Sequence, residues 1–181
     1  FIERSPNAKL VTVEIAFGDR EFTITESNNP FHVQLRTNDE LWHKERAINI
    51  AISRLPLDWR YVAWIDGDVA FFRPDWANET LHQLQRYSVV QMFNEAIDLN
   101  ANYNPLMRHK GFAACHVQGA PTGKSVAGLY EAVILPQGVR AWHPGFAWAM
   151  TKDAYNALGG LFDVGVLGAG DNHMAKAFIG Q

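Results

Sequence analysis

The chain has 181 residues, with 16 basic and 19 acidic side chains and a formal net charge of −3. Hydrophobic residues make up 48% and charged residues 19%, which is typical of a folded globular protein and too apolar for intrinsic disorder. The mild acidity excludes a protein that binds nucleic acid mainly through clustered Lys and Arg. We therefore expect one domain over residues 1–181 and no nucleic-acid partner.

Cysteine content and apolar runs give an expectation about the compartment. The single cysteine, Cys115, cannot form an internal disulfide or a zinc site built on paired cysteines, and it favours a reducing, cytoplasmic environment. No apolar run approaches the roughly 20 residues that span a bilayer, so no integral membrane segment is predicted. Because the chain begins with Phe1 rather than Met, we expect further residues to precede it in the native protein.

The first part of the chain alternates predicted strands with a predicted helix. The runs Leu10–Ala16 and Phe31–Leu35 have strand patterns. A Thr-x-x-Glu sequence at Thr37–Glu40 predicts a helix start, and helical spacing of apolar residues continues until Pro56. The apolar run Tyr61–Ile65 predicts a strand buried on both faces of a mostly parallel sheet.

The rest of the chain continues the alternation, apart from a long irregular stretch expected over about 94–128. The other predicted elements are a helix over Pro74–Leu84, strands over Val89–Phe93 and Phe146–Met150, a helix capped by Thr151 and ended by Gly159–Gly160, and a short helix after Gly170–Asp171. Strands alternating with helices predict an α/β fold.

Two carboxylates lie one residue apart where the most apolar predicted strand ends. Asp66 and Asp68 belong to the sequence WIDGDVAFF, at the carboxyl end of a strand, which is where ligands bind in open α/β sheets. Carboxylates this close repel each other unless a cation or a shared proton relieves the repulsion. We expect a divalent metal, Mn²⁺ or Mg²⁺, that also binds a diphosphate. The alternative is an Asp-Gly turn with no further role.

An apolar strand that ends in Asp-x-Asp, in the middle of an α/β chain, resembles the nucleotide-sugar glycosyltransferases of the GT-A fold. The resemblance covers about Leu10 to Phe178. It implies a Rossmann-like, mostly parallel sheet flanked by helices, whose first βα unit is missing here unless it precedes Phe1. It also implies that Asp66 and Asp68 hold the metal that binds the donor's diphosphate, with residues 1–93 forming a donor half and 94–181 an acceptor half.

A late glycine-rich stretch, LGAGDNHMA, matches the part of the family that often carries a catalytic acid. By this resemblance Asp171 is the candidate base for the acceptor hydroxyl and His173 a further metal ligand. Glycines allow close approach to a sugar, and a helix N-terminus stabilises a nearby anion. Alternatively, Asp171 caps the following helix and His173 is structural.

Two charged residues in the first part of the chain are donor-binding candidates. Lys44 lies on or near the helical stripe that should face the sheet, so it either reaches the donor's phosphates or extends to solvent or a carboxylate. Glu14 interrupts a predicted strand where the resembled enzymes often keep an acid near the nucleobase, although a half-exposed strand position explains it equally well.

The segment Trp142–Phe146 resembles the family's acceptor-side segment. There aromatic rings stack on sugar faces and glycine allows close contact, which makes Trp142, His143 and Gly145 acceptor-side candidates. Core packing is the alternative for Trp142.

Two other motifs fit less well. The glycines of Gly119–Ser125 are separated by three residues, whereas a P-loop needs four. A phosphatase with an Asp nucleophile would need Thr or Val where Ala70 stands.

We therefore expect a metal-dependent glycosyltransferase that moves a sugar from a nucleotide-diphosphate donor to a glycan or other hydroxyl acceptor. Two further classes stay open. One is a non-catalytic module that binds a nucleotide sugar or a glycan. The other is a nucleotidyltransferase on a related fold.

Overall fold

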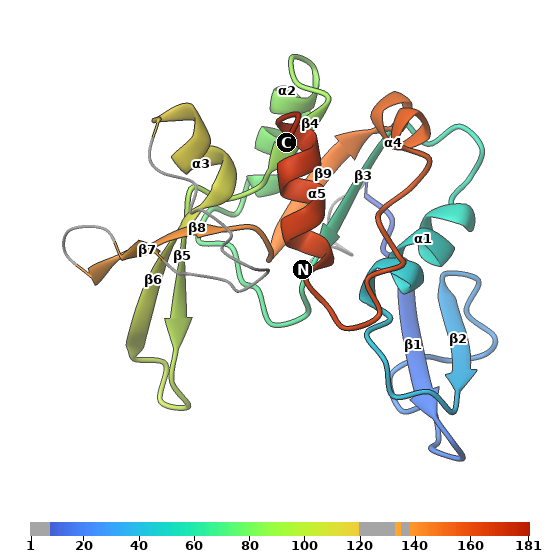
Figure 1. Cartoon of the computed structure of the whole chain (residues 1–181). Helices are drawn as coiled ribbons and strands as arrows, with labels where there is room; N and C mark the ends of the chain where they lie inside the picture. Colours follow the sequence, from blue (N-terminus) through green and yellow to red (C-terminus); the bar gives the residue numbers. More distant parts are fainter. Residues whose placement is uncertain (1–7, 120–132, 135–137) are drawn as a thin grey trace. The chain divides into compact units, whose positions relative to one another are not determined.

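The computed structural model describes residues 8–119, 133–134 and 138–181 (Figure 1). These residues form a mixed α/β fold of helices and small sheets. Contacts divide the chain into two compact units. Unit 1 consists of Phe1–Val62 and Thr151–Met174, and unit 2 of Ala63–Met150 and Ala175–Gln181.

Unit 1 begins with two parallel strands and a helix. Strand β1 (Thr12–Phe17) pairs in parallel with β2 (His32–Thr37), and α1 (Lys44–Ser53) packs on β1 (Figure 1). Helix α4 (Lys152–Leu158) follows later in the chain, and α5 (Gly170–Phe178) begins in this unit and ends in unit 2. The buried side chains of unit 1 include Ala16, Ile52, Leu161 and Met174.

Helix α4 has both ends fixed by local chemistry. The Thr151 hydroxyl accepts a hydrogen bond from the Ala154 N–H at 3.2 Å, which satisfies one of the unpaired donors of the first turn. At the other end Gly159 adopts φ +74°, a left-handed conformation that glycine takes without strain. The predicted cap and stop of this helix are confirmed.

Asn49, on α1, holds the segment that follows α4. Its Nδ2 donates to the Leu161 carbonyl at 2.9 Å and to Asp163 Oδ2 at 3.1 Å. Its Oδ1 accepts from the Leu161 N–H at 2.9 Å and from the Tyr155 hydroxyl at 3.0 Å. This one side chain therefore fixes the start of the segment that leads to α5.

Unit 2 contains two sheets, in the strand orders β3-β9-β4 and β5-β6-β8-β7. Helix α3 packs on β4, β6 and β8, and α2 packs on β4 (Figure 1). The elements are β3 (Tyr61–Ile65), which begins in unit 1, α2 (Trp76–Leu84), β4 (Val89–Gln91), β5 (Glu95–Leu99), β6 (Pro105–Gly111), α3 (Phe112–Val117), β7 (Val133–Ile134), β8 (Arg140–His143) and β9 (Ala147–Thr151), which ends in unit 1.

The core of unit 2 forms around β9 and its neighbours. Residues 147–150 of β9 are buried, and β9 pairs with β4 in the antiparallel direction. Phe112 of α3 packs against Trp142 of β8, with ring centroids 5.2 Å apart. Burial of such large apolar side chains is the main source of stability in a unit of this size.

The α/β class is confirmed, but the expected single, mostly parallel sheet is wrong. The described residues form three small sheets. The pairs β1–β2 and β6–β8 are parallel, whereas β4–β9, β5–β6 and β7–β8 are antiparallel. Short connections explain the antiparallel pairs β5–β6 and β7–β8, because tight turns join antiparallel strands and cannot join parallel ones. The division into a donor half and an acceptor half concerns binding and stays a prediction.

The predicted helix start at Thr37–Glu40 is wrong. Thr37 ends β2, paired with Phe17, and its hydroxyl accepts from the Asp39 N–H at 3.1 Å in a local turn. Helix α1 begins at Lys44 after His43, which makes no side-chain capping hydrogen bond. Strand pairing therefore prevails over the local capping pattern.

Two further expectations need correction. Strand β3 has the predicted bounds, but Tyr61 and Ala63 are exposed, so the strand is not buried on both faces. The stretch expected to be irregular contains β5, β6 and α3. Asn100 Oδ1 accepts from the N–H groups of Asn102 and Asn104, which shapes the turn between β5 and β6. Residues 120–128 of that stretch, and most of the P-loop-like Gly119–Ser125, lie outside the described residues.

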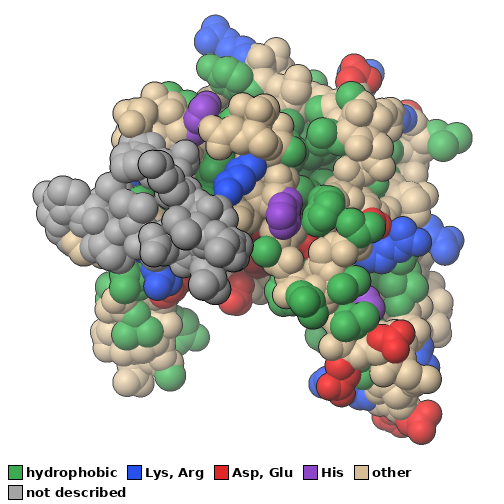
Figure 2. Space-filling model, viewed as in Figure 1, with side chains coloured by type: hydrophobic (Ala, Val, Ile, Leu, Met, Phe, Trp, Pro, Cys, Tyr) green, Lys and Arg blue, Asp and Glu red, His purple; other side chains and the backbone are tan. Residues whose placement is uncertain are grey.

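Apolar side chains also reach the surface, and Figure 2 shows several of them in green on the visible face. In unit 1 they include Leu41, Trp42, Phe162, Val164, Val166 and Leu167. The two segments that carry them are joined by a hydrogen bond from the Trp42 N–H to the Val166 carbonyl, at 2.9 Å. Among the described residues, no helix has both the length and the apolar character needed to cross a membrane.

Replacing Asn49 by Ala should lower the free energy of unfolding by about 2 kcal/mol or more, because several part-buried partners lose their hydrogen bonds. Ser53→Ala, at an exposed position of the same helix, is the control and should change stability by less than about 0.5 kcal/mol. Chemical denaturation measures both. Equal losses in the two variants would contradict the role given to Asn49.

Candidate active site

The acidic motif lies in a turn directly after β3. Asp66 is half-buried and Asp68 is exposed. The Val69 N–H donates to the Asp66 carbonyl at 3.1 Å, which closes the turn. The Asp66 N–H donates to the Phe146 carbonyl at 2.8 Å. Within unit 2, the acidic motif is therefore hydrogen-bonded to the turn between β8 and β9.

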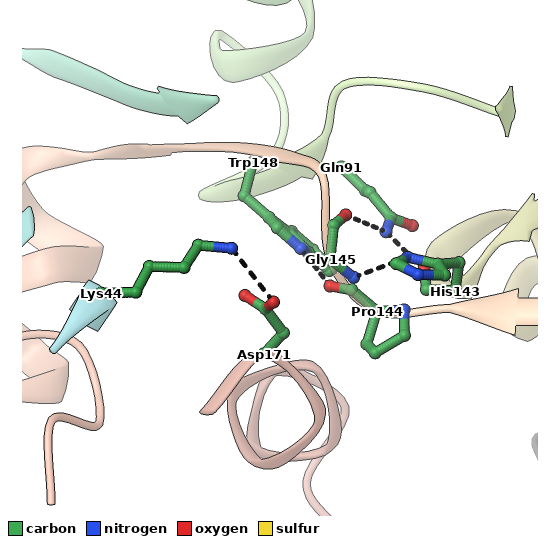
Figure 3. A network of polar contacts seen from close by, with 7 residues as sticks. All are labelled: Lys44, Gln91, His143, Pro144, Gly145, Trp148 and Asp171. Atoms are coloured by element: carbon green, nitrogen blue, oxygen red, sulfur yellow. Dashed lines mark hydrogen bonds and ion pairs between the residues drawn. The ribbon is translucent and has the colours of Figure 1, made fainter. Parts of the chain in front are cut away.

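The backbone of that turn, residues 143–146, is held by two side chains (Figure 3). Gln91 Nε2 donates to the His143 carbonyl at 2.8 Å, with a longer 3.5 Å contact to the Gly145 carbonyl. Trp148 Nε1 donates to the Pro144 carbonyl at 2.6 Å. With the bond from Asp66 to Phe146, every carbonyl of the turn accepts a hydrogen bond, so its conformation is strongly determined.

Gln91 has a second role as a link to α3. Its Oε1 accepts from the Ala113 N–H at 2.9 Å, and its side chain packs against Gly111. A β-carbon on Gly111 would lie 2.8 Å from Gln91 Oε1 and 2.9 Å from the Phe93 carbonyl oxygen. Glycine is required there because any larger residue would displace Gln91 or the backbone at Phe93.

Aromatic rings gather on the same turn. The His143 and Phe146 rings stack with centroids 3.8 Å apart and planes 3° from parallel. Phe146 has φ +73°, a conformation that costs a bulky residue free energy and that clusters at functional sites. The Gly145 N–H donates to His143 Nδ1 at 3.1 Å, so a neutral His143 carries its proton on Nε2 (Figure 3).

The three acceptor-side candidates lie in and beside this turn in different environments. Trp142 is buried and packs on Phe112, as the core-packing alternative expected. His143 is half-buried, and Gly145 is buried against Gln91. A contact with an acceptor stays a prediction for all three.

His109 is a residue of this region that the sequence analysis missed. It is buried on β6, and its Nε2 lies 2.7 Å from Asp98 Oδ2. Its ring meets those of His143 and Phe146 edge to face, at 5.1 and 5.9 Å. The Asn-rich segment between β5 and β6 is the signal that would have revealed this hairpin, because such residues favour tight turns.

In unit 1, two predicted site residues contact each other. Lys44 is the first residue of α1 and Asp171 lies in the first turn of α5. Lys44 Nζ lies 3.2 Å from Asp171 Oδ2, and the two side chains are 23% and 22% exposed (Figure 3). Because α5 begins at Gly170, Asp171 is the second residue of the helix and does not occupy its cap position.

Glu45, next to Lys44, is a second residue that the sequence analysis missed. It is buried on the first turn of α1 and packs against Gly170 of α5. Burial is the main cause that raises the pKa of its carboxyl, and the nearby Asp171 raises it further. Periodicity alone does not reveal a buried acid at this position.

His173, the predicted third metal ligand, lies on α5 in unit 1. Its ring is 5.1 Å from that of Phe162, a contact that a structural histidine would also make. In the described part of the chain, no three His, Cys, Asp or Glu side chains gather as a metal cluster. Two carboxylates nevertheless suit Mg²⁺ or Mn²⁺, which proteins often hold with one or two carboxylates plus a substrate's phosphates. The metal role of His173 stays a prediction.

Glu14 organises a loop of unit 1. Its carboxylate accepts hydrogen bonds from the N–H groups of Thr23, Ile24 and Thr25 and from the Thr25 hydroxyl. These bonds, with that of Thr23 first, lower the pKa of Glu14 to about 2. The residue also lines a cavity of about 260 Å³, together with Val13, Ile15, Ala16, Arg20, Glu21, Thr23 and Ile24. A role beside a nucleobase stays a prediction.

Comparisons with known proteins give no further assignment. No protein-family model, curated protein or solved structure matches the chain.

Replacing Glu14 by Gln should change how stability depends on pH. Because the folded-state pKa of Glu14 is depressed to about 2 from an ordinary value of 4.5, its contribution is complete above pH 4.5 and is lost as pH falls toward 2. The wild-type chain should therefore lose stability across this window more steeply than Glu14→Gln. Denaturation at several pH values measures both slopes, and Glu26→Gln controls for removing one exposed carboxylate nearby. Parallel slopes in wild type and Glu14→Gln would contradict this role.

Proposed function

We propose that this chain is a metal-dependent glycosyltransferase of the GT-A kind, which moves a sugar from a nucleotide-diphosphate donor to a hydroxyl acceptor. The observation that carries the proposal is the hydrogen bond between the Asp66 N–H and the Phe146 carbonyl. It joins two exposed or half-exposed carboxylates to a strained, aromatic turn within one unit. The Asp-x-Asp sequence after an apolar strand resembles the metal motif of such enzymes, and this motif, not the arrangement of the sheets, supports the assignment.

The donor's diphosphate is assigned to Asp66 and Asp68. Their carboxylate oxygens are the ligands that Mg²⁺ and Mn²⁺ prefer, and the exposure of Asp68 leaves room for phosphate oxygens. When bound, the metal supplies Lewis-acid stabilisation of the charge that develops on the leaving diphosphate. The backbone bond at Asp66 fixes the start of the turn, so little ordering is needed when the donor binds.

Proton transfer is assigned to Asp171. If the reaction inverts the anomeric centre, the Asp171 carboxylate takes the proton of the acceptor hydroxyl as its oxygen attacks the sugar. If the reaction retains configuration, Asp171 orients the sugar instead. Lys44 Nζ lies 3.2 Å from Asp171 Oδ2, which holds the carboxylate in one orientation.

The acceptor is assigned to the turn 143–146. The stacked rings of His143 and Phe146 offer a flat aromatic surface for the face of a sugar ring. Because the turn's carbonyls are already paired, acceptor recognition falls to the side chains. The burial of Trp142 leaves it the role of supporting this turn from the core.

Asp68→Ala should abolish Mn²⁺-dependent binding of a nucleoside diphosphate, with at least a roughly tenfold loss of affinity, because half of the carboxylate pair is removed. Titration calorimetry with UDP and GDP, with and without Mn²⁺, measures the effect. Asp58→Ala, at an exposed position of unit 1, is the matched control and should bind like the wild type. An Asp68 variant with wild-type metal dependence would overturn the metal assignment.

Asp171→Asn should leave nucleoside-diphosphate binding unchanged while turnover falls by roughly 10²-fold or more, because the amide cannot accept the proton. Turnover is measured as Mn²⁺-dependent release of nucleoside diphosphate from UDP-glucose, UDP-N-acetylglucosamine or GDP-mannose. Asp163→Asn, which removes another paired carboxylate of unit 1, is the control. Full activity in Asp171→Asn would exclude Asp171 as the base.

The same assays separate the other two classes. A binding module would bind the nucleoside diphosphate and release none from any sugar donor. A nucleotidyltransferase would consume a nucleoside triphosphate and release pyrophosphate.

A further inference from the structure

Glu45 is a buried carboxyl in the first turn of α1. The residue is 3% exposed, and its Oε1 has no hydrogen-bond partner among the described residues. Removing a carboxyl from water without full hydrogen bonding costs free energy, more so when the group is charged. Glu45 is therefore a buried acid whose packing calls for a closer description.

The surroundings of Glu45 increase this cost at neutral pH. Burial is the main cause that raises the pKa of Glu45, and the Asp171 carboxylate raises it further, whereas a hydrogen bond from the Glu45 backbone N–H, the Lys44 ammonium and a Trp42 side-chain hydrogen bond lower it. Two carboxyl groups and one ammonium thus share the region where α1 and α5 begin. Ionisable groups whose surroundings disfavour their charged form are common at functional sites.

The Glu45 side chain lies between the first turns of two helices of unit 1. It comes from the first turn of α1, and its carboxyl end meets Gly170, the first residue of α5. A β-carbon on Gly170 would lie 2.9 Å from Glu45 Cγ and still closer to the carboxyl group. Any residue larger than glycine at position 170 would displace the Glu45 side chain from its present position, so the two residues are matched in shape.

The residues next to this contact, both in unit 1, form the Lys44–Asp171 ion pair. Lys44 precedes Glu45, and Asp171 follows Gly170. The contact between Glu45 and Gly170 therefore sets the spacing of the two turns that bring Lys44 Nζ within 3.2 Å of Asp171 Oδ2. A shift of about 1 Å in a catalytic group costs roughly 10²-fold in rate. A side chain that fixes this spacing has a functional reason to be retained.

We propose that Glu45 is a positioning residue for Asp171: its buried side chain, packed against Gly170, holds the first turn of α5 so that the Asp171 carboxylate faces Lys44. The inference rests on the proposed function for the part played by Asp171 in proton transfer. Glu45 acts through shape and packing, and it does not touch the reacting atoms.

The test compares four variants. Glu45→Gln keeps the shape of the side chain, Glu45→Ala removes it, and Gly170→Ala displaces the Glu45 carboxyl. The double variant Glu45→Ala/Gly170→Ala removes the side chain and fills part of the space. Glu79→Gln, a half-buried glutamate in the first turn of α2, is the matched control.

Turnover is read as Mn²⁺-dependent release of nucleoside diphosphate from the three nucleotide sugars named above. Glu45→Ala and Gly170→Ala should each lower kcat by roughly tenfold or more, with the donor KM unchanged. Glu45→Gln should stay within about threefold of wild type and melt no lower than wild type, because the buried charge is removed while the shape is kept. The double variant should be no slower than the slower single variant, because both changes disturb one contact.

A purely structural role predicts a different pattern. In that case the kcat losses of Glu45→Ala and Gly170→Ala would follow their losses in melting temperature, and kcat would recover at temperatures where both variants are fully folded. Full kcat in Glu45→Ala would also overturn the proposal.

A readout without substrate separates failure of this inference from failure of the proposed function. The nitrogen-15 signal of the Lys44 ammonium should shift in Asp171→Asn, and by a similar amount in Glu45→Ala, but not in Glu45→Gln. An unmoved signal in Glu45→Ala refutes the positioning role even if the wild type turns over no donor. Absence of nucleoside-diphosphate binding in the wild type, with the expected Lys44 shifts, refutes the proposed function alone.

Discussion

The hydrogen bond from the Asp66 N–H to the Phe146 carbonyl is the contact on which the account of unit 2 depends. It ends β3 at the acidic motif and fixes the last carbonyl of the turn between β8 and β9. The other carbonyls of that turn are taken by Gln91 and Trp148, so the turn has little freedom. Such complete pairing supports the positive φ of Phe146, whose ring would otherwise favour a relaxed backbone. A preorganised turn beside two carboxylates is what a site for a charged ligand requires.

Unit 1 contains two glutamates, Glu14 and Glu45, whose carboxyl groups lie in contrasting environments. Glu14 accepts several hydrogen bonds from one loop, which stabilises its ionised form and the loop together. Glu45 is buried without full pairing and is destabilised in its ionised form. The first arrangement needs no function beyond stability. The second glutamate lies against Gly170, next to the residues of the Lys44–Asp171 ion pair, and this place in the fold is the reason for proposing that Glu45 positions Asp171.

Local patterns predicted several elements well because local chemistry determines them. Helix α4 has its cap at Thr151 and its stop at Gly159, and β3 has the bounds expected from its apolar run. The start of α1 was missed because Thr37 is held in β2 by pairing with β1, which a local capping pattern does not reveal. The arrangement of the sheets was also missed, since strand pairing depends on contacts far apart in sequence.

The candidate site was predictable in its residue types and not in its contacts. Asp66 and Asp68 stand out in the sequence because two acids follow an apolar strand. The pairing of Lys44 with Asp171 joins segments far apart in the chain, so only the fold reveals it. Glu45 and His109 were missed for the same reason, since burial and an orphaned polar atom are properties of packing and not of periodicity.

The most direct test of the central claim is to locate Mn²⁺ on the protein by NMR. Mn²⁺ broadens the signals of nearby nuclei, so the amide signals of an isotope-labelled chain can be recorded with Mn²⁺ in the presence of UDP or GDP. The account predicts that residues 66–68 and the turn 143–146 broaden first, and that Asp68→Ala removes the effect. Broadening centred on another part of the chain, or no broadening with either nucleotide, would contradict the claim that Asp66 and Asp68 hold the metal and the donor's diphosphate.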